Sequence, residues 1–148
     1  MKKRIATTAI ILVMGFVSAF ASDSKPAGDG IASSFYKDFS NAKEVSWQQE
    51  KGYHVASFKM NGNIMMAYYD NRFGLIAVVH HMLSDNLPIY LQVDLKNNYS
   101  NYWVSDLYEV ASARESHYRI TLENADKIIV LNSFNGRNWK VQSEIAKM

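Results

Sequence analysis

The sequence predicts an α+β fold in which two tandem α-β-β-β-β repeats form an antiparallel sheet of about eight strands with the helices on one face. Three observations support this fold. Two apolar-rich runs flank Asn61-Gly62 and predict a β-hairpin over residues 53–74. An order of helix-like and strand-like segments occurs twice along the chain. Removal of an export signal leaves about 127 residues, which is enough for one compact domain.

The N-terminus has the pattern of a secretory signal peptide, which we predict over residues 1–21. Three basic residues at 2–4 precede an apolar run over 5–20, and Ala19-Phe20-Ala21 has the small-x-small form that signal peptidase cleaves. Cleavage removes three of the sixteen Lys+Arg and none of the fourteen Asp+Glu, which leaves a formal net charge of −1. Such a chain lacks the clustered positive charge of nucleic-acid-binding proteins. We therefore expect a periplasmic or secreted protein, with no membrane anchor after signal cleavage and no nucleic-acid partner.

The segment 22–30 is rich in Ser, Asp and Gly, and we predict that it is a flexible mature N-terminus. A single domain made of two repeats is expected over residues 31–148, and its first repeat covers 31–83. That repeat starts with a short helix, because apolar residues recur at helical spacing from Ile31. Strands are then predicted over 43–48, over the two arms of the hairpin, and over 75–81.

The Asn61-Gly62 pair predicts how the hairpin side chains are arranged. Asn-Gly favours a two-residue type I′ turn, which places Met60 opposite Asn63 and Phe58 opposite Met65. Because strand residues alternate between faces, the expected core face carries Ala56, Phe58, Met65, Ala67 and Tyr69. The second face carries Tyr53, Val55, Ser57, Ile64, Met66 and Tyr68. Both faces are substantially apolar.

The second repeat is predicted over residues 84–148. It begins with a helix over about 85–99 whose buried stripe includes Leu91. Ile89 and Val93 point away and are expected to contact the neighbouring short helix, the alternative being an external partner. Strands are expected over 104–110, 117–123, 127–133 and 138–142, at an offset of about sixty residues from the first repeat. Asn135-Gly136 is a second type I′ signal, which pairs Asn132 with Trp139 and Val130 with Val141.

Several motifs in this order resemble a known family. They are Phe35…Phe39-Ser40-Asn41-Ala42…Val45-Ser46-Trp47, Phe58…Asn61-Gly62, Tyr69-Asp70…Gly74, Leu87-Pro88 and Tyr118…Leu122. The chain is similar to the beta-lactamase-inhibitor-like, PepSY-like proteins of secreted Bacteroidetes type. The resemblance implies a tandem-repeat α+β fold and a periplasmic protein of no settled activity. The family name implies inhibitory binding by analogy only.

No motif identifies a reaction, so we expect neither an enzyme, nor a cofactor, nor a metal site. The sequence has no GxSxG, no HExxH and no cysteine. His80 and His81 are adjacent on a predicted strand, so they point to opposite faces and cannot chelate one ion together. His54 and His117 are expected at matching places in the two repeats, as packed or half-solvated strand residues.

The second face of the hairpin is the candidate partner-binding surface. Its proposed contact residues, expected to be partly exposed, are Tyr53, Val55, Ile64, Met66 and Tyr68. Tyrosine combines apolar area with a polar tip, and methionine adapts its shape to a partner. The alternative structural interpretation is that the other repeat or the N-terminal segment covers this face.

These features favour a protein-binding module, inhibitor-like by family resemblance, that binds an unidentified extracytoplasmic protein. Self-association into a homo-oligomer stays open. The alternative function is an envelope sensor or a carrier of a small apolar ligand. A closed cavity of a few hundred cubic ångströms would indicate the carrier, whereas a broad Tyr/Met surface would indicate a protein partner.

Overall fold

The computed structural model describes residues 28–148. The predicted signal peptide and residues 22–27 of the predicted flexible segment lie outside the described residues. Helix α1 (Asp29–Asp38) begins within the last two residues of that segment, so Asp29 and Gly30 are helical. The remaining elements follow the predicted order closely.

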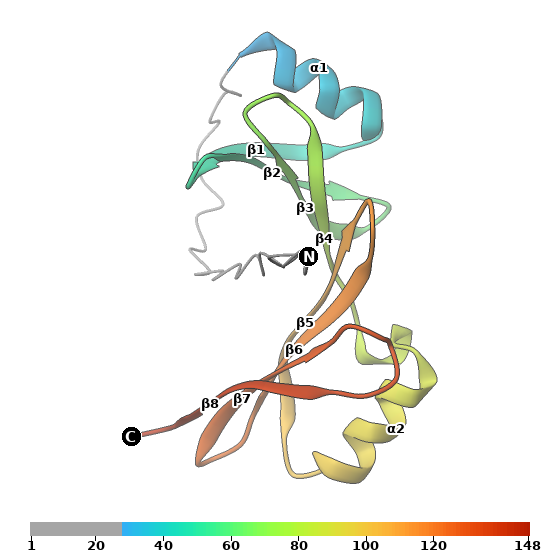
Figure 1. Cartoon of the computed structure of the whole chain (residues 1–148), viewed down its shortest axis with the longest axis vertical. Coiled ribbons are helices and arrows are strands. Elements are labelled where there is room, and N and C mark those ends of the chain that lie inside the picture. The colour runs from blue at the N-terminus through green and yellow to red at the C-terminus, as the bar shows by residue number, and fades with distance from the viewer. Residues whose placement is uncertain (1–27) are drawn as a thin grey trace, which may run out of the picture.

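One antiparallel sheet contains eight strands in sequence order, which confirms the predicted fold class. Figure 1 shows β1 to β3 beside α1 and β5 to β8 beside α2, with β4 leading from one half to the other. A 3-10 helix, η1 (Ser84–Asn86), and helix α2 (Ile89–Asn98) connect the two halves. The strands are β1 (Lys43–Glu50), β2 (Tyr53–Met60), β3 (Asn63–Tyr69), β4 (Leu75–His81), β5 (Trp103–Ser112), β6 (Ser116–Glu123), β7 (Lys127–Ser133) and β8 (Lys140–Ala146).

The β2–β3 hairpin has the predicted register. Met60 pairs with Asn63, and Phe58 pairs with Met65. Asn61 and Gly62 both have positive φ, at 52° and 80°, as a type I′ turn requires. A local turn signal in the sequence therefore fixed which side chains share a face along two strands.

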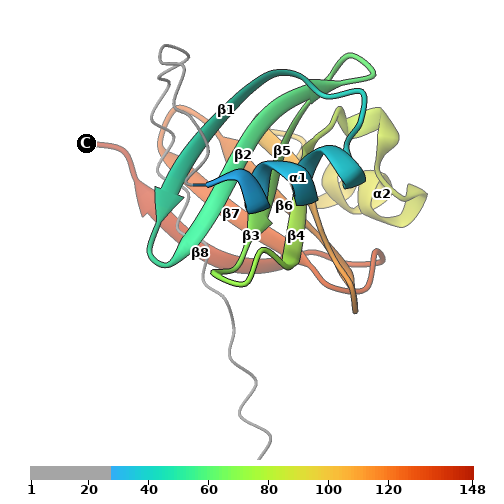
Figure 2. The same cartoon turned by 90° about the horizontal axis from the view of Figure 1, so that it is seen from above.

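Both helices lie on the same face of the sheet. In the first half, Phe35 of α1 is fully buried, and its ring centroid lies 5.0 Å from that of Phe58 and 5.3 Å from that of Trp47. Figure 2 shows α1 crossing the strands of this half. The buried residues of this core are Ile31, Phe35, Phe39, Trp47, Ala56, Phe58, Ala67 and Tyr69. The predicted core face of the hairpin is thus confirmed.

Helix α2 covers the same face in the second half. Cross-strand pairing links Ala67 to Val78 and Val78 to Ala111, and alternation along β5 then places Leu107 on this face. The buried residues around α2 are Leu87, Leu91, Leu107, Ile120, Leu122, Ile129, Leu131 and Trp139. Two separate cores on one face leave the opposite face without a helix.

The outer residues of α2 do not contact α1, so that expectation was wrong. Ile89 is 63% exposed and Val93 is 48% exposed. Helix α1 packs on the strands of the first half and α2 on those of the second, so the two helices lie at opposite ends of the molecule's long axis (Figure 1). The sheet between them is too wide for a helix-to-helix contact.

The β7–β8 connection also differs from the prediction. Gly136 has a positive φ of 66°, but Asn135 does not, so no type I′ turn forms. The side-chain Oδ1 of Asn135 instead accepts backbone N–H groups from Arg137 and Asn138. The longer loop places Lys140 opposite Asn132 and delays the start of β8 to Lys140.

Candidate functional site

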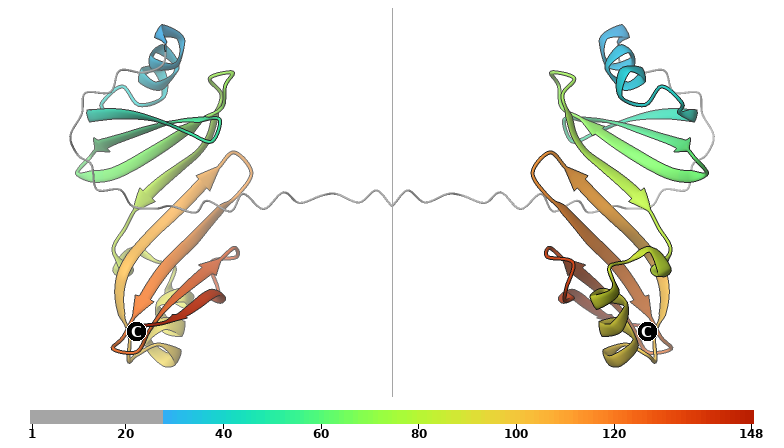
Figure 3. Two further views of the ribbon diagram at one scale, coloured as in Figure 1. Left: turned by 90° about the vertical axis from the view of Figure 1, so that its left-hand side faces the viewer. Right: turned by 90° about the vertical axis from the view of Figure 1, so that its right-hand side faces the viewer.

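The face of the sheet that carries neither helix is the candidate site, and we call it the helix-free face. Figure 3 shows the twisted sheet from two opposite directions. The centre of the helix-free face is an apolar cluster contributed by neighbouring strands β2 to β5. Its buried members are Val55, Tyr68, Ala77, Val79, Tyr108 and Val110, with Met66 and Ile76 packed against them.

All five predicted contact residues share the helix-free face, but they differ in exposure. Ile64 is 40% exposed, and Tyr53 and Met66 are half-buried. Val55 and Tyr68 are only 4% and 5% exposed, so the expectation of partial exposure was wrong for these two. Tyr68 pairs with Ala77 of β4, and the side chains of β4 and β5 complete the cluster around it. An isolated hairpin cannot show this coverage, because the covering strands come later in the chain.

The burial of Tyr68 has an electrostatic consequence. Loss of hydration raises the pKa of the Tyr68 phenol to about 12, and the nearby Glu50 carboxylate and Tyr108 add to the rise. Burial also raises the pKa of Tyr108. Both phenols stay protonated at neutral pH, so they add no charge to the centre of the face.

A row of polar residues crosses the second half of the helix-free face. Successive cross-strand pairs join His81 to Tyr108, Tyr108 to Arg119, Arg119 to Asn132 and Asn132 to Lys140. Arg119 is half-buried and Lys140 is exposed. Within residues 28–148, neither cation has a carboxylate within salt-bridge distance. The row therefore presents positive charge beside the apolar cluster.

Asn132 is a buried polar member of this row, as Tyr108 is a buried aromatic one. Asn132 is 7% exposed, and its side-chain N–H donates a 3.1 Å hydrogen bond to Oε1 of Gln142. Its Oδ1 is buried with no hydrogen-bond partner among the described residues. An unpaired buried amide oxygen costs stability, so this position is not optimised for folding alone.

The adjacent histidines His80 and His81 lie on opposite faces of β4. His80 pairs with Glu109 and His81 with Tyr108, so the two side chains point to opposite faces as predicted. His81 Nδ1 lies 3.4 Å from Asp106 Oδ1. Burial raises the pKa of Asp106, while attraction to His81 and Arg119 partly offsets that rise. No group of three metal-binding side chains occurs in the described part of the chain.

His54 and His117 do not occupy matching places, which corrects the prediction. His54 pairs with Gln49 and lies on the helix-covered face, whereas His117 pairs with Val110 on the helix-free face. The ring of His117 lies 5.1 Å from that of Phe134, which is 57% exposed. Burial lowers the pKa of His117 and favours the neutral imidazole. The pair thus presents an exposed aromatic surface at the margin of the cluster.

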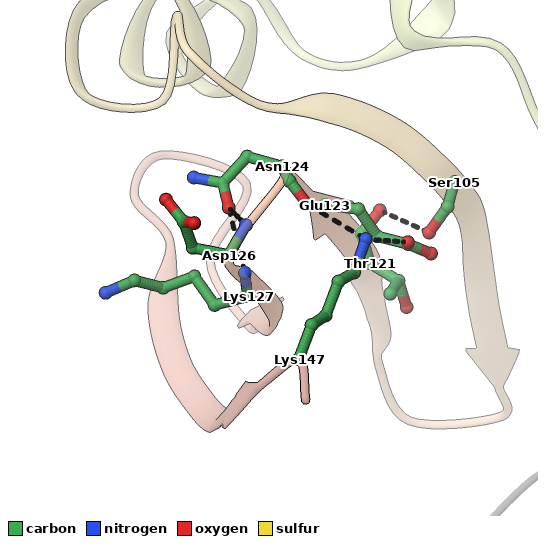
Figure 4. Close-up of polar contacts among 7 residues, drawn as sticks. All are labelled: Ser105, Thr121, Glu123, Asn124, Asp126, Lys127 and Lys147. Carbon is green, nitrogen blue, oxygen red and sulfur yellow. Dashed lines mark hydrogen bonds and ion pairs between the residues drawn. The ribbon is translucent and has the colours of Figure 1, made fainter.

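The far end of the helix-free face carries a second exposed aromatic residue. Trp103 is 53% exposed, and the ammonium of Lys147 lies 4.9 Å from its ring centroid. Lys147 also pairs with Glu123 at 2.9 Å and donates to the carbonyl of Asn124 at 2.8 Å, contacts that Figure 4 shows. These contacts hold the residues after β8 against the sheet beside Trp103.

Sequence reasoning missed the contribution of the second half to this face. Tyr108, Arg119, Phe134 and Trp103 were not among the predicted contact residues. A signal was present: Arg119 precedes the apolar Ile120 on a strand, so strand alternation places Arg119 on the face opposite the core. Only the strand order shows that Arg119 and Tyr68 belong to one surface.

A solvent-open cavity of about 650 Å³ lies between the α1–β1 turn and the β2–β3 turn. Lys59 and Glu44 form a 2.7 Å ion pair at its wall. The lining residues are Ser40, Asn41, Ala42, Lys43, Glu44, Lys59, Met60, Asn61 and Gly62. Six of these nine residues are polar or charged, and the cavity is open to solvent, so it differs from the enclosed apolar pocket that a carrier of small apolar ligands requires.

Known structures share this architecture. A DUF2874 family protein from Bacteroides uniformis aligns with a TM-score of 0.72 and 17% identity, covering 81% of this chain and 89% of its own. A BLIP-like protein from Bacteroides fragilis aligns with a TM-score of 0.70 and 21% identity, covering 82% and 87% respectively. This chain has the BLIP-like fold. The resemblance inferred from the sequence is thereby confirmed at the level of the fold.

A third structure with the BLIP-like fold is described as a candidate periplasmic protein from Bacteroides eggerthii. It aligns with a TM-score of 0.72 and 17% identity and covers 82% of this chain and 90% of its own. No family model and no curated protein matches the chain. Among the described residues, no helix has the length and apolar character needed to cross a membrane.

Proposed function

We propose that this protein is a periplasmic binding module that engages a protein partner through its helix-free face. The observation that carries the proposal is a buried apolar centre surrounded by exposed large side chains on one surface. The exposed members are Ile64 at 40%, Trp103 at 53%, Phe134 at 57% and Ile145 at 59%. Protein interfaces commonly combine such aromatic and aliphatic anchors with a polar rim.

An extracytoplasmic location is supported by the signal-peptide pattern at residues 1–21 and by the candidate periplasmic protein that shares the fold. The BLIP-like name of another neighbour supports inhibition of an extracytoplasmic enzyme as the form that binding takes. This inhibitory role is a proposal by analogy, because one fold serves many functions.

A non-catalytic role fits the chemistry of the face. His81 lies beside Asp106 and His117 stacks near Phe134. The centre of the face is the buried apolar cluster that includes Tyr68 and Tyr108. We therefore propose that the module acts by binding.

The test is affinity capture of periplasmic proteins by the mature protein, followed by measurement of Kd with the purified partner. Ile64→Ser combined with Phe134→Ser removes two exposed side chains from the helix-free face. Ile89→Ser combined with Val93→Ser is the matched control, because it removes two exposed apolar side chains from α2. The proposal expects at least about tenfold weaker binding for the first variant and unchanged binding for the control. The reverse pattern would place the site on α2.

A further inference from the structure

The two halves of the helix-free face differ in chemistry at equivalent positions. The core residues Ala56 of β2 and Ala67 of β3 pair with each other, as do Ile120 of β6 and Leu131 of β7. Each pair lies under the helix of its own half. The residue before the first member and the residue after the second therefore lie on the helix-free face, and these two positions in the first half correspond to the same two positions in the second half. These are Val55 and Tyr68 in the first half and Arg119 and Asn132 in the second.

The next strand of each half shows the same difference in chemistry. Tyr68 pairs with Ala77 of β4, whereas Asn132 pairs with Lys140 of β8. The first half therefore carries an apolar row, Val55–Tyr68–Ala77. The second half carries the row Arg119–Asn132–Lys140, in which two cations flank a buried amide. One surface thus offers an apolar part and a positively charged part side by side.

Arg119 is placed to pair with an external carboxylate. It is half-buried between Tyr108 and Asn132, where reduced hydration strengthens a charge-assisted hydrogen bond. The carboxylate of Asp106 attracts Arg119 but lies beside His81 and forms no salt bridge with Arg119. The guanidinium fork therefore keeps bidentate capacity that the described residues do not use.

The spacing of the row fits an extended peptide. Arg119 and Lys140 stand two strands apart, which corresponds to about 10 Å across the sheet. In an extended segment, the Cα atoms of Asp or Glu residues at alternate positions lie about 7 Å apart, and the two side chains can reach both cations. Phe134, exposed two residues beyond Asn132, offers an apolar contact at the margin of the row.

We propose that Arg119 and Lys140, which flank Asn132 in this row, form an acidic-segment subsite, which binds Asp or Glu side chains of an extended segment of the protein partner. This inference rests on the proposed function and specifies the partner chemistry at that face. Val55, Tyr68 and their neighbours supply the apolar part of the same contact surface.

The test uses three synthetic peptides, Ac-Gly-Glu-Phe-Glu-Gly-NH2 and its analogues with Gln or Lys in place of both Glu residues. Binding to the 15N-labelled mature protein is measured by NMR titration. The acidic peptide is expected to bind about tenfold more tightly than the Gln peptide, to weaken as salt is raised, and to shift resonances of β6 to β8. Equal affinity for the acidic and basic peptides, or no binding of either, would overturn the subsite.

Variants connect this preference to individual side chains. Arg119→Gln is expected to abolish the preference for the acidic peptide, and Arg119→Lys to retain part of it, because lysine keeps the charge but not the fork. Arg114→Gln is the matched control, since Arg114 is exposed in the β5–β6 connection. Persistence of the preference in a folded Arg119→Gln protein would contradict the proposal.

Capture of the natural partner separates the two proposals. If Arg119→Gln binds the partner as wild type does while Ile64→Ser with Phe134→Ser does not, the acidic-segment subsite is wrong and the helix-free face remains the site. If neither variant weakens binding, both proposals are wrong.

Discussion

The indole Nε1 of Trp139 donates a 3.1 Å hydrogen bond to the backbone carbonyl of Leu91. The backbone N–H of Trp139 also donates to Oδ2 of Asp94 at 3.1 Å. One residue at the end of the β7–β8 loop is thereby joined twice to α2. This attachment joins the β7–β8 loop to α2, which lies on the side of the sheet opposite the candidate site.

Replacement of this anchor should destabilise the domain. Trp139 is 7% exposed and Phe58, which packs in the other core, is 2% exposed. Trp139→Ala and Phe58→Ala should each lower the free energy of unfolding by about 3–5 kcal/mol, because each leaves a buried cavity. Chemical denaturation measures the loss, with exposed Phe134→Ala as control. Losses below about 1 kcal/mol, as for surface substitutions, would mean that the core and helix-free faces are exchanged.

Tyr68 should behave as a core residue although it lies on the helix-free face. Because it is 5% exposed, Tyr68→Ser should lower the free energy of unfolding by about 3 kcal/mol. Met66→Ser on the same strand should cost less, about 1 kcal/mol, because Met66 is only half-buried. Equal small losses for the two variants would contradict the buried cluster.

The same tyrosine predicts a stability change at high pH. Burial raises the pKa of Tyr68 to about 12, against a usual value near 10. The folded state therefore holds this proton more tightly than the unfolded state, so the contribution to stability is complete below about pH 10 and is lost as the pH rises through about 12. The free energy of unfolding of Tyr68→Phe should fall less steeply across this range than that of wild type. Parallel profiles would show that Tyr68 does not titrate differently on folding.

Asn132 offers a test of the stability cost of its unpaired buried oxygen. Its buried Oδ1 has no hydrogen-bond partner among residues 28–148. Asn132→Leu keeps a side chain of similar size and removes the unpaired acceptor, so the free energy of unfolding should rise by about 1 kcal/mol. Thermal and chemical denaturation measure this change, and Gln142→Ala controls for the lost hydrogen bond from Asn132. A clear loss of stability would show that the amide oxygen has a partner in solution.

The sequence predicted those features of the fold that depend on nearby residues. Asn61-Gly62 specified the register of β2 and β3, because a type I′ turn fixes both strands at once. The same turn rule failed at Asn135-Gly136, where the attachment of Trp139 to α2 and the side-chain hydrogen bonds of Asn135 favour a longer loop. Local turn chemistry was overridden there by contacts with a helix more than forty residues earlier.

The candidate site was only partly predictable for a related reason. Strand alternation correctly grouped Val55, Ile64, Met66 and Tyr68 on one face. The burial of Val55 and Tyr68 depends on Val79 and Tyr108, which come from later strands. Pairing between β4 and β5 brings these strands together across the two halves, and no local pattern specifies that pairing.

Site-specific photocrosslinking in the periplasm tests the central claim most directly. A photoreactive amino acid is placed at Met66 on the helix-free face and, in a separate protein, at Val93 on the outer side of α2, which is 48% exposed. Binding through the helix-free face predicts a covalent adduct with the partner from position 66 and none from position 93. An adduct from position 93 alone would contradict the account and assign partner binding to α2.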